Sequence, residues 1–244
     1  MARPSRSAPA FVRLAGHPVR WQLLTALAHG DLRVRELVEL TGRPQNLISY
    51  HLRLLRDGGL VTAVSSTFDG RDSYYHLDLD RCADGLAGVG AALHPALGPR
   101  TPAVRRSGLA TLFVCTGNSA RSPVAEALLR RHAAGHVTVT SAGTSPRPRL
   151  HPHAVRVLRD RFGIDVAGQR PRPVEAVLDR RFDYVITLCD KAREASPEFA
   201  GDPYRLHWSV PDPGAAGYPA FTRMAADLDT RVRHLLPVLG ITDQ

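Results

Sequence analysis

The chain has 244 residues, of which 43 % are hydrophobic, and a net charge of +9. This hydrophobic fraction is enough to build packed cores and excludes a largely disordered chain. No apolar run approaches the roughly 20 residues of a membrane-spanning helix, and the first ten residues lack the apolar stretch of a secretory signal. We therefore expect a cytoplasmic protein without a membrane segment.

The basic charge favours a polyanionic partner but does not identify one, because it is spread over both halves of the chain. The three cysteines, Cys82, Cys115 and Cys189, are far apart and form no closely spaced pair. This spacing argues against a disulfide framework and against a zinc ribbon. The histidines of the first half have no metal-binding spacing either, so we predict no metal site.

The first half of the chain predicts helices followed by a β-hairpin. Apolar residues recur at helical spacing, and two β-prone runs flank Asp69-Gly70, a dipeptide that favours a tight turn. The expected helices span residues 11–29, 34–40, 44–57 and 79–93, and the expected strands span residues 60–64 and 73–77. This order of elements predicts an α+β winged helix-turn-helix domain, which we place at residues 1–93.

Residues 94–107 are rich in proline and glycine and predict a linker. Beyond them, strand and helix patterns alternate along the chain. The expected strands span residues 109–114, 137–141, 184–188 and 205–208, and the expected helices span residues 123–132, 153–162 and 218–239. Alternation of this kind predicts an α/β domain, at residues 108–244, whose central parallel sheet is flanked by helices on both faces.

A loop between an expected strand and an expected helix carries the sharpest chemical pattern. Residues 115–122 read Cys-Thr-Gly-Asn-Ser-Ala-Arg-Ser. A loop at a helix N-terminus points several backbone N–H groups at one spot, where the helix dipole also favours negative charge. We therefore predict that a tetrahedral oxyanion binds in a nest formed by Thr116, Gly117, Asn118, Ser119 and Ala120.

Three side chains of the same segment would act on the bound oxyanion. The planar guanidinium of Arg121 can hold two oxygens at once. The positive field of the loop favours the thiolate of Cys115, which is the nucleophilic form. The Ser122 hydroxyl can donate a hydrogen bond to that thiolate and can cap the helix.

With this loop, residues 108–239 resemble the low-molecular-weight phosphatase family, including its thiol-dependent arsenate reductase branch. Further stretches that carry the resemblance are residues 141–144 (Ser-Ala-Gly-Thr), 187–190 (Thr-Leu-Cys-Asp) and 207–213 (His-Trp-Ser-Val-Pro-Asp-Pro). The resemblance makes Asp212 the general acid that protonates the leaving oxygen.

Two reactions are open to such a domain, and both begin with attack by Cys115 on the oxyanion. A phosphatase hydrolyses the phosphocysteine with water and requires no cofactor. A reductase needs a second thiol, for which the resemblance supplies Cys189, and an external thiol or a redoxin to reduce the resulting bridge. The alternative for Cys189 is a small apolar core residue at a strand end.

Some residues around the loop match the reductase branch, and others match the phosphatases. Asn118, Glu126 and Ser141 match positions resembling the cation site of the reductase branch. Ser196 stands where that branch commonly has a third cysteine, and Pro123 is more typical of the phosphatases. Cys82 lies in the expected dimerisation helix and is a poor substitute for the third thiol.

The first domain resembles the ArsR-type winged-helix repressors through residues 14–21 and 47–61. The resemblance implies a homodimer whose recognition helices read two half-sites of a double-stranded DNA operator. Leu47, Ile48, Leu52 and Leu55 would face inward. The residues expected to contact DNA are Gln45, Asn46, Ser49, Tyr50 and Arg53 on the recognition helix and Arg71 at the hairpin tip.

One departure concerns the metalloid site of this family. Arsenic-sensing members carry a cysteine pair at the start of the second helix, where this chain has Arg33 and Arg35. We therefore expect no metalloid site there.

Together these patterns favour a DNA-binding regulator fused to an oxyanion enzyme, either an arsenate reductase or a protein tyrosine phosphatase acting on a phosphoprotein. One alternative is a regulator whose phosphatase-like domain only senses phosphate or arsenate without turnover. Another is an enzyme whose winged-helix domain serves only to form the dimer. The intact set of Cys115, Arg121 and Asp212 favours turnover over sensing.

Overall fold

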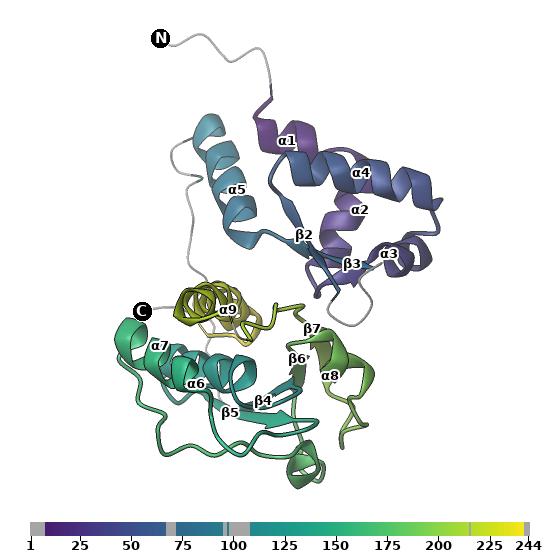
Figure 1. Cartoon of the computed structure of the whole chain (residues 1–244). Coiled ribbons are helices and arrows are strands. Elements are labelled where there is room, and N and C mark those ends of the chain that lie inside the picture. The colour runs from purple at the N-terminus through teal and green to yellow at the C-terminus, as the bar shows by residue number, and fades with distance from the viewer. Residues whose placement is uncertain (1–7, 67–71, 95–96, 98–107, 215, 242–244) are drawn as a thin grey trace. The chain divides into compact units, whose positions relative to one another are not determined.

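The computed structural model describes residues 8–66, 72–94, 97, 108–214 and 216–241 (Figure 1). The chain divides into two compact units, residues 1–101 and 102–244, and each unit has its own hydrophobic core. The division falls within the segment in which we expected the linker. No helix among the described residues is long and apolar enough to cross a membrane.

The first unit contains five helices and three short strands in its described part. Its elements are α1 (Ala10–Ala15), α2 (Pro18–Leu27), β1 (Leu32–Arg33), α3 (Val34–Thr41), α4 (Gln45–Asp57), β2 (Val61–Ser65), β3 (Ser73–Leu77) and α5 (Leu79–Leu93). The strands form an antiparallel sheet in the order β1-β3-β2. The fold is therefore the predicted helix-turn-helix with a small antiparallel sheet. The expected turn at residues 69–70 lies outside the described residues.

The single helix that we predicted over residues 11–29 is wrong, because the chain forms two helices there. Gly16 ends α1, and the His17 side chain accepts a hydrogen bond from the Val19 N–H at the start of α2. Pro18 then occupies the first turn of α2, where its missing N–H costs nothing. The two-residue strand β1 was not predicted either, since it is too short to produce an alternating pattern.

Helix α4 buries one narrow stripe of apolar side chains. Ile48, Leu52 and Leu55 are fully buried at helical spacing, as predicted. Leu47, which we also expected to face inward, is only half-buried. It lies about 100° around the helix axis from Ile48 and about 40° from the buried His51, and so at the edge of the buried face.

The second unit alternates strands and helices. Its elements are β4 (Leu109–Cys115), α6 (Arg121–Ala133), β5 (Val137–Gly143), α7 (Pro152–Phe162), the 3-10 helix η2 (Val174–Val177), β6 (Tyr184–Thr187), α8 (Asp190–Glu194), β7 (Tyr204–His207) and α9 (Tyr218–Val238). The strands form a parallel sheet in the order β5-β4-β6-β7. This is the predicted parallel sheet flanked by helices. Only the short elements η2 and α8 were missed.

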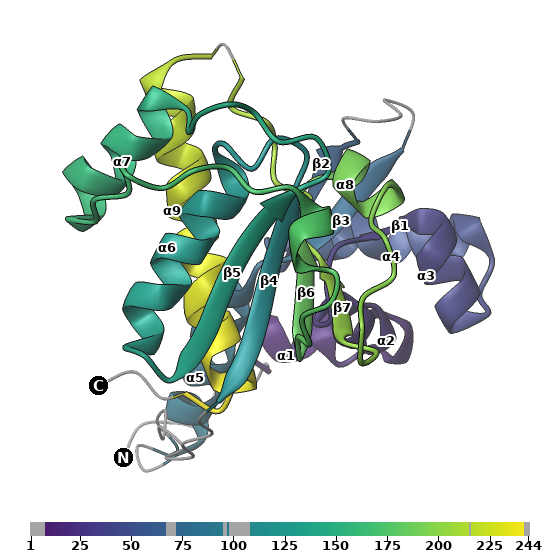
Figure 2. The same ribbon diagram turned by 90° about the horizontal axis from the view of Figure 1, so that it is seen from below.

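Helix α6 is the centre of the helical layer. Figures 1 and 2 show α6, α7 and α9 on the same side of the sheet, where α6 contacts both β4 and β5. Because α9 covers the other side of α6, all of the first nine residues of α6 are buried. The carboxyl end of β4 and the amino end of α6 therefore frame residues 116–120, and neither end can move without disturbing the core.

Phe113 is one of the largest fully buried side chains of this core. It is fully buried on the central strand β4, with its ring centroid 5.8 Å from that of Trp208. We expect Phe113→Ala to lower the free energy of unfolding by about 3–5 kcal/mol, measured by urea denaturation. Tyr204→Ala is the control, because Tyr204 is 74 % exposed, and it should cost less than about 1 kcal/mol. Similar losses for both variants would contradict this assignment of the core.

Candidate functional site

The loop from Thr116 to Ala120 turns its carbonyl groups toward one neighbouring segment. The carbonyls of Cys115, Thr116, Gly117 and Ser119 accept hydrogen bonds of 2.8–3.1 Å from the backbone N–H groups of residues 144, 145, 147 and 151. In a trans peptide the N–H of the next residue points the opposite way from the carbonyl. The N–H groups of the loop are therefore directed away from that segment, as an anion-binding nest requires.

Two backbone positions make this loop conformation depend on residue type. Asn118 has a φ of 44°, in the left-handed region where asparagine is one of the tolerated residues. Gly143, at the end of β5, has no room for a side chain, because a Cβ there would lie 2.7 Å from the Thr116 carbonyl oxygen. A larger residue at position 143 would push the loop out of place.

Cys115 lies at the end of β4 and is 2 % exposed. Its Sγ is 3.0 Å from the Ser122 Oγ, which itself accepts a hydrogen bond of 2.9 Å from the Asn118 amide. The Ser122 proton is thus left for the sulfur, or for the Ala142 carbonyl at the longer distance of 3.4 Å. The structure brings the predicted nucleophile and hydroxyl donor together in a geometry that suits a thiolate.

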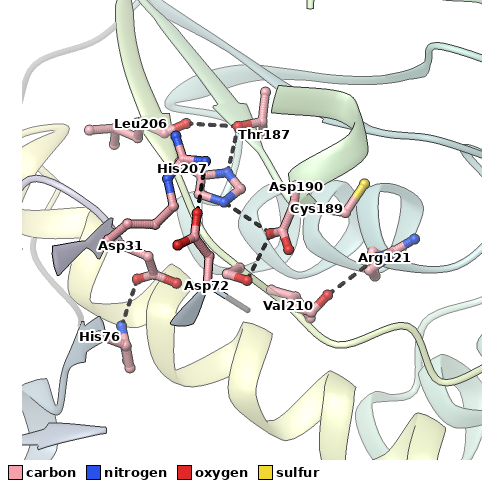
Figure 3. Close-up of polar contacts among 12 residues, drawn as sticks. Asp31, Asp72, His76, Arg121, Thr187, Cys189, Asp190, Leu206, His207 and Val210 are labelled. Carbon is pink, nitrogen blue, oxygen red and sulfur yellow. Dashed lines mark hydrogen bonds and ion pairs between the residues drawn. The ribbon is translucent and has the colours of Figure 1, made fainter. Parts of the chain in front are cut away.

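Arg121 and Asp212 form an ion pair at the mouth of the loop. The Arg121 Nη2 is 2.9 Å from the Asp212 Oδ2. Its Nη1 donates to the Val210 carbonyl at 3.3 Å (Figure 3). Arg121 is buried, whereas 58 % of the Asp212 side chain is exposed. The Arg121 Nε is buried and has no hydrogen-bond partner among the described residues, so the guanidinium keeps a donor available for an oxyanion.

Cys189 lies close to the same loop. It follows β6, which runs parallel to β4 with Thr187 paired to Val114, so both thiols stand at the carboxyl ends of adjacent strands. Adjacent strands are about 4.8 Å apart. The buried Cys189 Sγ lies 3.3 Å from the Thr116 Oγ1. Cys189 therefore lies beside the loop, where a second thiol for Cys115 would have to be.

Cys82 has a different environment. It is half-buried in α5 of the first unit. Burial, together with the charge of Asp78, raises the pKa of the Cys82 thiol to about 11. A thiol with so high a pKa is almost wholly protonated at neutral pH and is a weak nucleophile, which agrees with its exclusion as a third redox thiol.

A buried carboxylate behind the loop has several partners, of which the sequence resemblance indicated only one, Ser141. Glu126 is 3 % exposed and accepts hydrogen bonds from Ser141 at 2.5 Å and from Gln169 at 2.8 Å. Arg130, one turn further along α6, forms an ion pair with it. The sequence resemblance placed Glu126 at a cation site, and here a guanidinium of the chain supplies positive charge to the carboxylate. Among the described residues no three His, Cys, Asp or Glu side chains gather to hold a metal ion.

This carboxylate connects to the nucleophile through a chain of side chains. Ser141 accepts a hydrogen bond of 2.9 Å from the Asn118 amide, which also donates to Ser122 beside Cys115. The Asn118 carbonyl oxygen in turn accepts from the Arg172 N–H at 2.7 Å. The left-handed residue of the loop is thereby held from both of its amide atoms. The sequence resemblance grouped Asn118, Glu126 and Ser141, which the network joins, whereas nothing in the sequence indicated Gln169 or Arg172.

A second buried carboxylate, Asp190, lies directly after Cys189. It is 1 % exposed and accepts a hydrogen bond of 2.9 Å from Ser209. One of its oxygens also lies 3.4 Å from the His207 Nε2, and Figure 3 shows His207 between Asp190 and Thr187. These contacts fix the start of the segment that leads to Asp212.

His151 is a further neighbour of the loop that sequence reasoning missed. Its Nδ1 accepts a hydrogen bond from the His153 N–H at the start of α7, and its ring stacks on Phe221 with centroids 4.3 Å apart. Burial is the main cause that lowers the pKa of His151, and nearby His153 adds to it while Asp212 opposes it. The imidazole is therefore mostly neutral at neutral pH and serves to pack and cap the chain that holds the loop.

In the first unit, helix α4 exposes most of the residues predicted to contact DNA. Gln45, Asn46, Tyr50 and Arg53 are exposed, and Ser49 is half-buried. Arg71 lies outside the described residues.

Helix α4 also contains a buried histidine, His51. His51 is 4 % exposed, and its ring lies 4.5 Å from that of His17. Burial lowers the pKa of His51, with smaller contributions from His17 and Arg20. His51 is therefore a packed residue of the core and does not face outward with the four exposed side chains.

Comparison with known proteins gives a family match for each unit. Residues 110–243 match the model of the family described as low molecular weight phosphotyrosine protein phosphatase, and residues 17–63 match that of the bacterial regulatory protein, arsR family. An arsenate reductase of Brevibacillus brevis is 31 % identical over 121 residues, which cover 50 % of this chain and 89 % of the relative. A glutaredoxin arsenate reductase of Synechocystis sp. is 32 % identical over 125 residues, covering 51 % and 94 %.

A solved structure of an arsenate reductase in its oxidized state is 30 % identical and matches with a TM-score of 0.50 over 54 % of this chain and 99 % of that one. The matched region contains the whole of the loop, the sheet and the helices that hold them. The chain belongs to the low molecular weight phosphotyrosine protein phosphatase family, and its first unit carries an ArsR-family helix-turn-helix domain.

Proposed function

We propose that this protein is a DNA-binding transcriptional regulator that also reduces arsenate, with Cys115 as the nucleophile and Cys189 as the second thiol. The observation that favours arsenate reduction over phosphate ester hydrolysis is the position of Cys189. A buried thiol stands at the end of the strand next to that of Cys115 and contacts the loop through Thr116. A hydrolytic phosphatase has no use for a second thiol at this place.

The reaction proceeds in two steps that balance. The Cys115 thiolate attacks the arsenic of arsenate held by the loop and Arg121, and an oxygen leaves as water with a proton supplied by Asp212. The Cys189 thiolate then attacks the Cys115 sulfur, and the electron pair of the sulfur–arsenic bond passes to arsenic. Arsenic is reduced from the +5 to the +3 state and leaves as arsenite, while the two thiols are oxidised to one disulfide.

The disulfide must be reduced before another turnover. Ser196 occupies the position where a third thiol would be needed to take over the disulfide by exchange within the chain. We therefore propose an external thiol or a redoxin as the reductant. One relative, the Synechocystis sp. glutaredoxin arsenate reductase, carries a name that supports a glutaredoxin in this role.

The test is mass spectrometry of the fully reduced protein after incubation with arsenate. We expect a peptide cross-link between Cys115 and Cys189, loss of two hydrogen masses, and one equivalent of arsenite per chain. Cys82 should stay alkylatable, because it is in the other unit and has a raised pKa of about 11. If both Cys115 and Cys189 remain free thiols, the reductase assignment is wrong and Cys189 is a core residue.

The second candidate reaction is hydrolysis of a phosphorylated protein. It is favoured by Pro123, which is more typical of the phosphatases, and by Ser196, which stands where the reductase branch commonly has a third cysteine. In this case water cleaves the phosphocysteine and no cofactor is used. Steady hydrolysis of an aryl phosphate, with no arsenite formed from arsenate, would favour this candidate. Oxyanion-dependent DNA release without any turnover would instead favour a purely sensing domain.

For the first unit we propose binding to a double-stranded DNA operator as a homodimer, in the cytoplasm where that DNA is found. Helix α5 supports the dimer, because none of its fifteen residues is buried and it leaves Leu86 and Leu93 exposed at 56 % and 73 %. An apolar helix face of this kind is typical of a subunit interface. Light scattering should give the mass of two chains, and a Leu86→Glu, Leu93→Glu variant should give that of one.

Arg53 provides a test of DNA contact. Its exposed guanidinium on α4 is suited to a base or a phosphate, so Arg53→Ala should weaken operator binding about tenfold. If the contact is to a phosphate, the slope of log affinity against log salt should also fall by about one. Arg223→Ala is the control, because it removes the same charge from an exposed position on α9. Equal losses in both variants would mean that net charge, rather than α4, governs binding.

A further inference from the structure

The second unit has a basic pocket between the segment before α7, the helix α7 itself and the turn at residues 167–170. Its volume is about 470 Å³, within the range of about 300–1,000 Å³ that small-molecule sites occupy. Leu150 and Val155 contribute apolar wall. The polar wall consists of Gln169 and four arginines, Arg149, Arg156, Arg159 and Arg170.

The positive charge of this pocket is only partly compensated. Asp160 is shared by Arg156 and Arg159, whose Nε atoms lie 3.1 Å and 3.4 Å from its oxygens. The hydrogen bond from Arg156 is the main cause that lowers the pKa of Asp160, which is therefore ionised at neutral pH. Arg149 and Arg170 have no ion pair with any described residue. Besides Asp160, Asp165 lies at the wall, where it accepts a hydrogen bond from the Ala167 N–H. Four cations thus outnumber two carboxylates, and the surplus positive charge favours an anionic ligand.

The chemistry of the lining narrows the class of ligand. Guanidinium groups bind phosphoryl oxygens in a planar, two-pronged manner, and a phosphoryl group carries nearly two charges at neutral pH because its second pKa is about 6. The apolar wall suits an organic body attached to such a group. We propose that this pocket binds a small organic phosphate, with its phosphoryl groups at Arg149 and Arg170 and its organic part against Leu150 and Val155.

The pocket is separate from the oxyanion loop but connected to its support. None of the residues 115–122 lines it. Gln169 lines the pocket and donates to Glu126, which holds Ser141 and, through it, Asn118 of the loop. The proposal does not rest on arsenate reduction, because the ligand would occupy the pocket whatever reaction Cys115 performs.

The test is calorimetric titration with adenosine diphosphate as the probe. The full chain carrying Arg121→Ala is used, so that the loop does not compete, and the wild-type chain is titrated in parallel in case the variant fails to fold. We expect a single site that Arg149→Ala together with Arg170→Ala weakens about tenfold or more. The matched pair Arg161→Ala and Arg223→Ala removes the same charge from exposed positions outside the pocket and should change the affinity less than about twofold.

Several results would overturn the proposal. One is that adenosine diphosphate binds neither the Arg121→Ala chain nor the wild-type chain. The others are an unchanged affinity in the double variant of Arg149 and Arg170, and an equal loss of affinity in the control pair. Inorganic pyrophosphate should bind at least about fivefold more weakly than the nucleotide, because it lacks the organic part. Equal affinity for the two probes would show that the apolar wall takes no part. Failure of arsenate to oxidise the two thiols leaves this titration unaffected, so the two proposals fail separately.

Discussion

Cys115→Ser should lower arsenate reduction and aryl phosphate hydrolysis by at least about ten-thousand-fold. Both reactions need the Cys115 sulfur to form the first bond, and a serine hydroxyl is far less ionised in the same place. The hydroxyl of Ser122 lies 3.0 Å from Sγ and suits a thiolate, whereas it gives no base to activate a serine. Initial rates of arsenite release and of phenol release check the result.

The same variant should still bind inorganic phosphate, because Arg121 and the loop amides are unchanged. Cys82→Ser serves as the control and should keep both rates within about twofold, since that thiol belongs to the other unit. A Cys115→Ser protein with more than about one per cent of the wild-type rate would show that another group begins the reaction.

Cys189→Ser is expected to separate the two candidate reactions. Arsenate reduction should fall by at least about a thousandfold, because the Cys115–arsenic adduct then has no neighbouring thiolate to release arsenite. Aryl phosphate hydrolysis should change less than about threefold, because water rather than Cys189 cleaves the phosphocysteine. The substitution is nearly isosteric and keeps a hydroxyl close to Thr116, which limits structural damage.

The ratio of the two rates is the quantity to measure, since a change in folding would lower both together. Cys189→Ala serves as a second variant, which lacks the serine hydroxyl and should give the same ratio. If arsenate reduction survives in both variants at the wild-type rate, the external thiol attacks Cys115 directly and Cys189 is only a core residue.

The sequence was most informative where structure is local. The strand before Cys115, the helix after it and the loop between them follow from an apolar run, a small polar segment and a helix start that are contiguous in the chain. The recognition helix was predicted for the same reason, because its buried stripe repeats within the 13 residues of α4. Short elements such as α8 fall below the length at which a period can be recognised.

What the sequence could not show depends on contacts between distant segments. Gln169 and Arg172 reach the loop network only because the chain returns past Glu126 and Asn118 after α7. His151 meets Phe221 across 70 positions of sequence. The break between α1 and α2 was missed for a different reason: the apolar period continues across Gly16, so the pattern hid a turn that Pro18 and the cap of His17 impose.

The cations of the second unit have one further consequence. In its described part, every positive side chain that lines the basic pocket or clamps the oxyanion loop is an arginine, and the only lysine of the chain is Lys191 in α8. Arginine keeps its proton beyond about pH 12, whereas a lysine ammonium loses it near pH ~10. Alkaline titration should therefore leave the positive charge of the oxyanion clamp and of the basic pocket unchanged. Any change of anion affinity with pH would then come from the anion or from other groups of the chain, and not from the arginines that bind it.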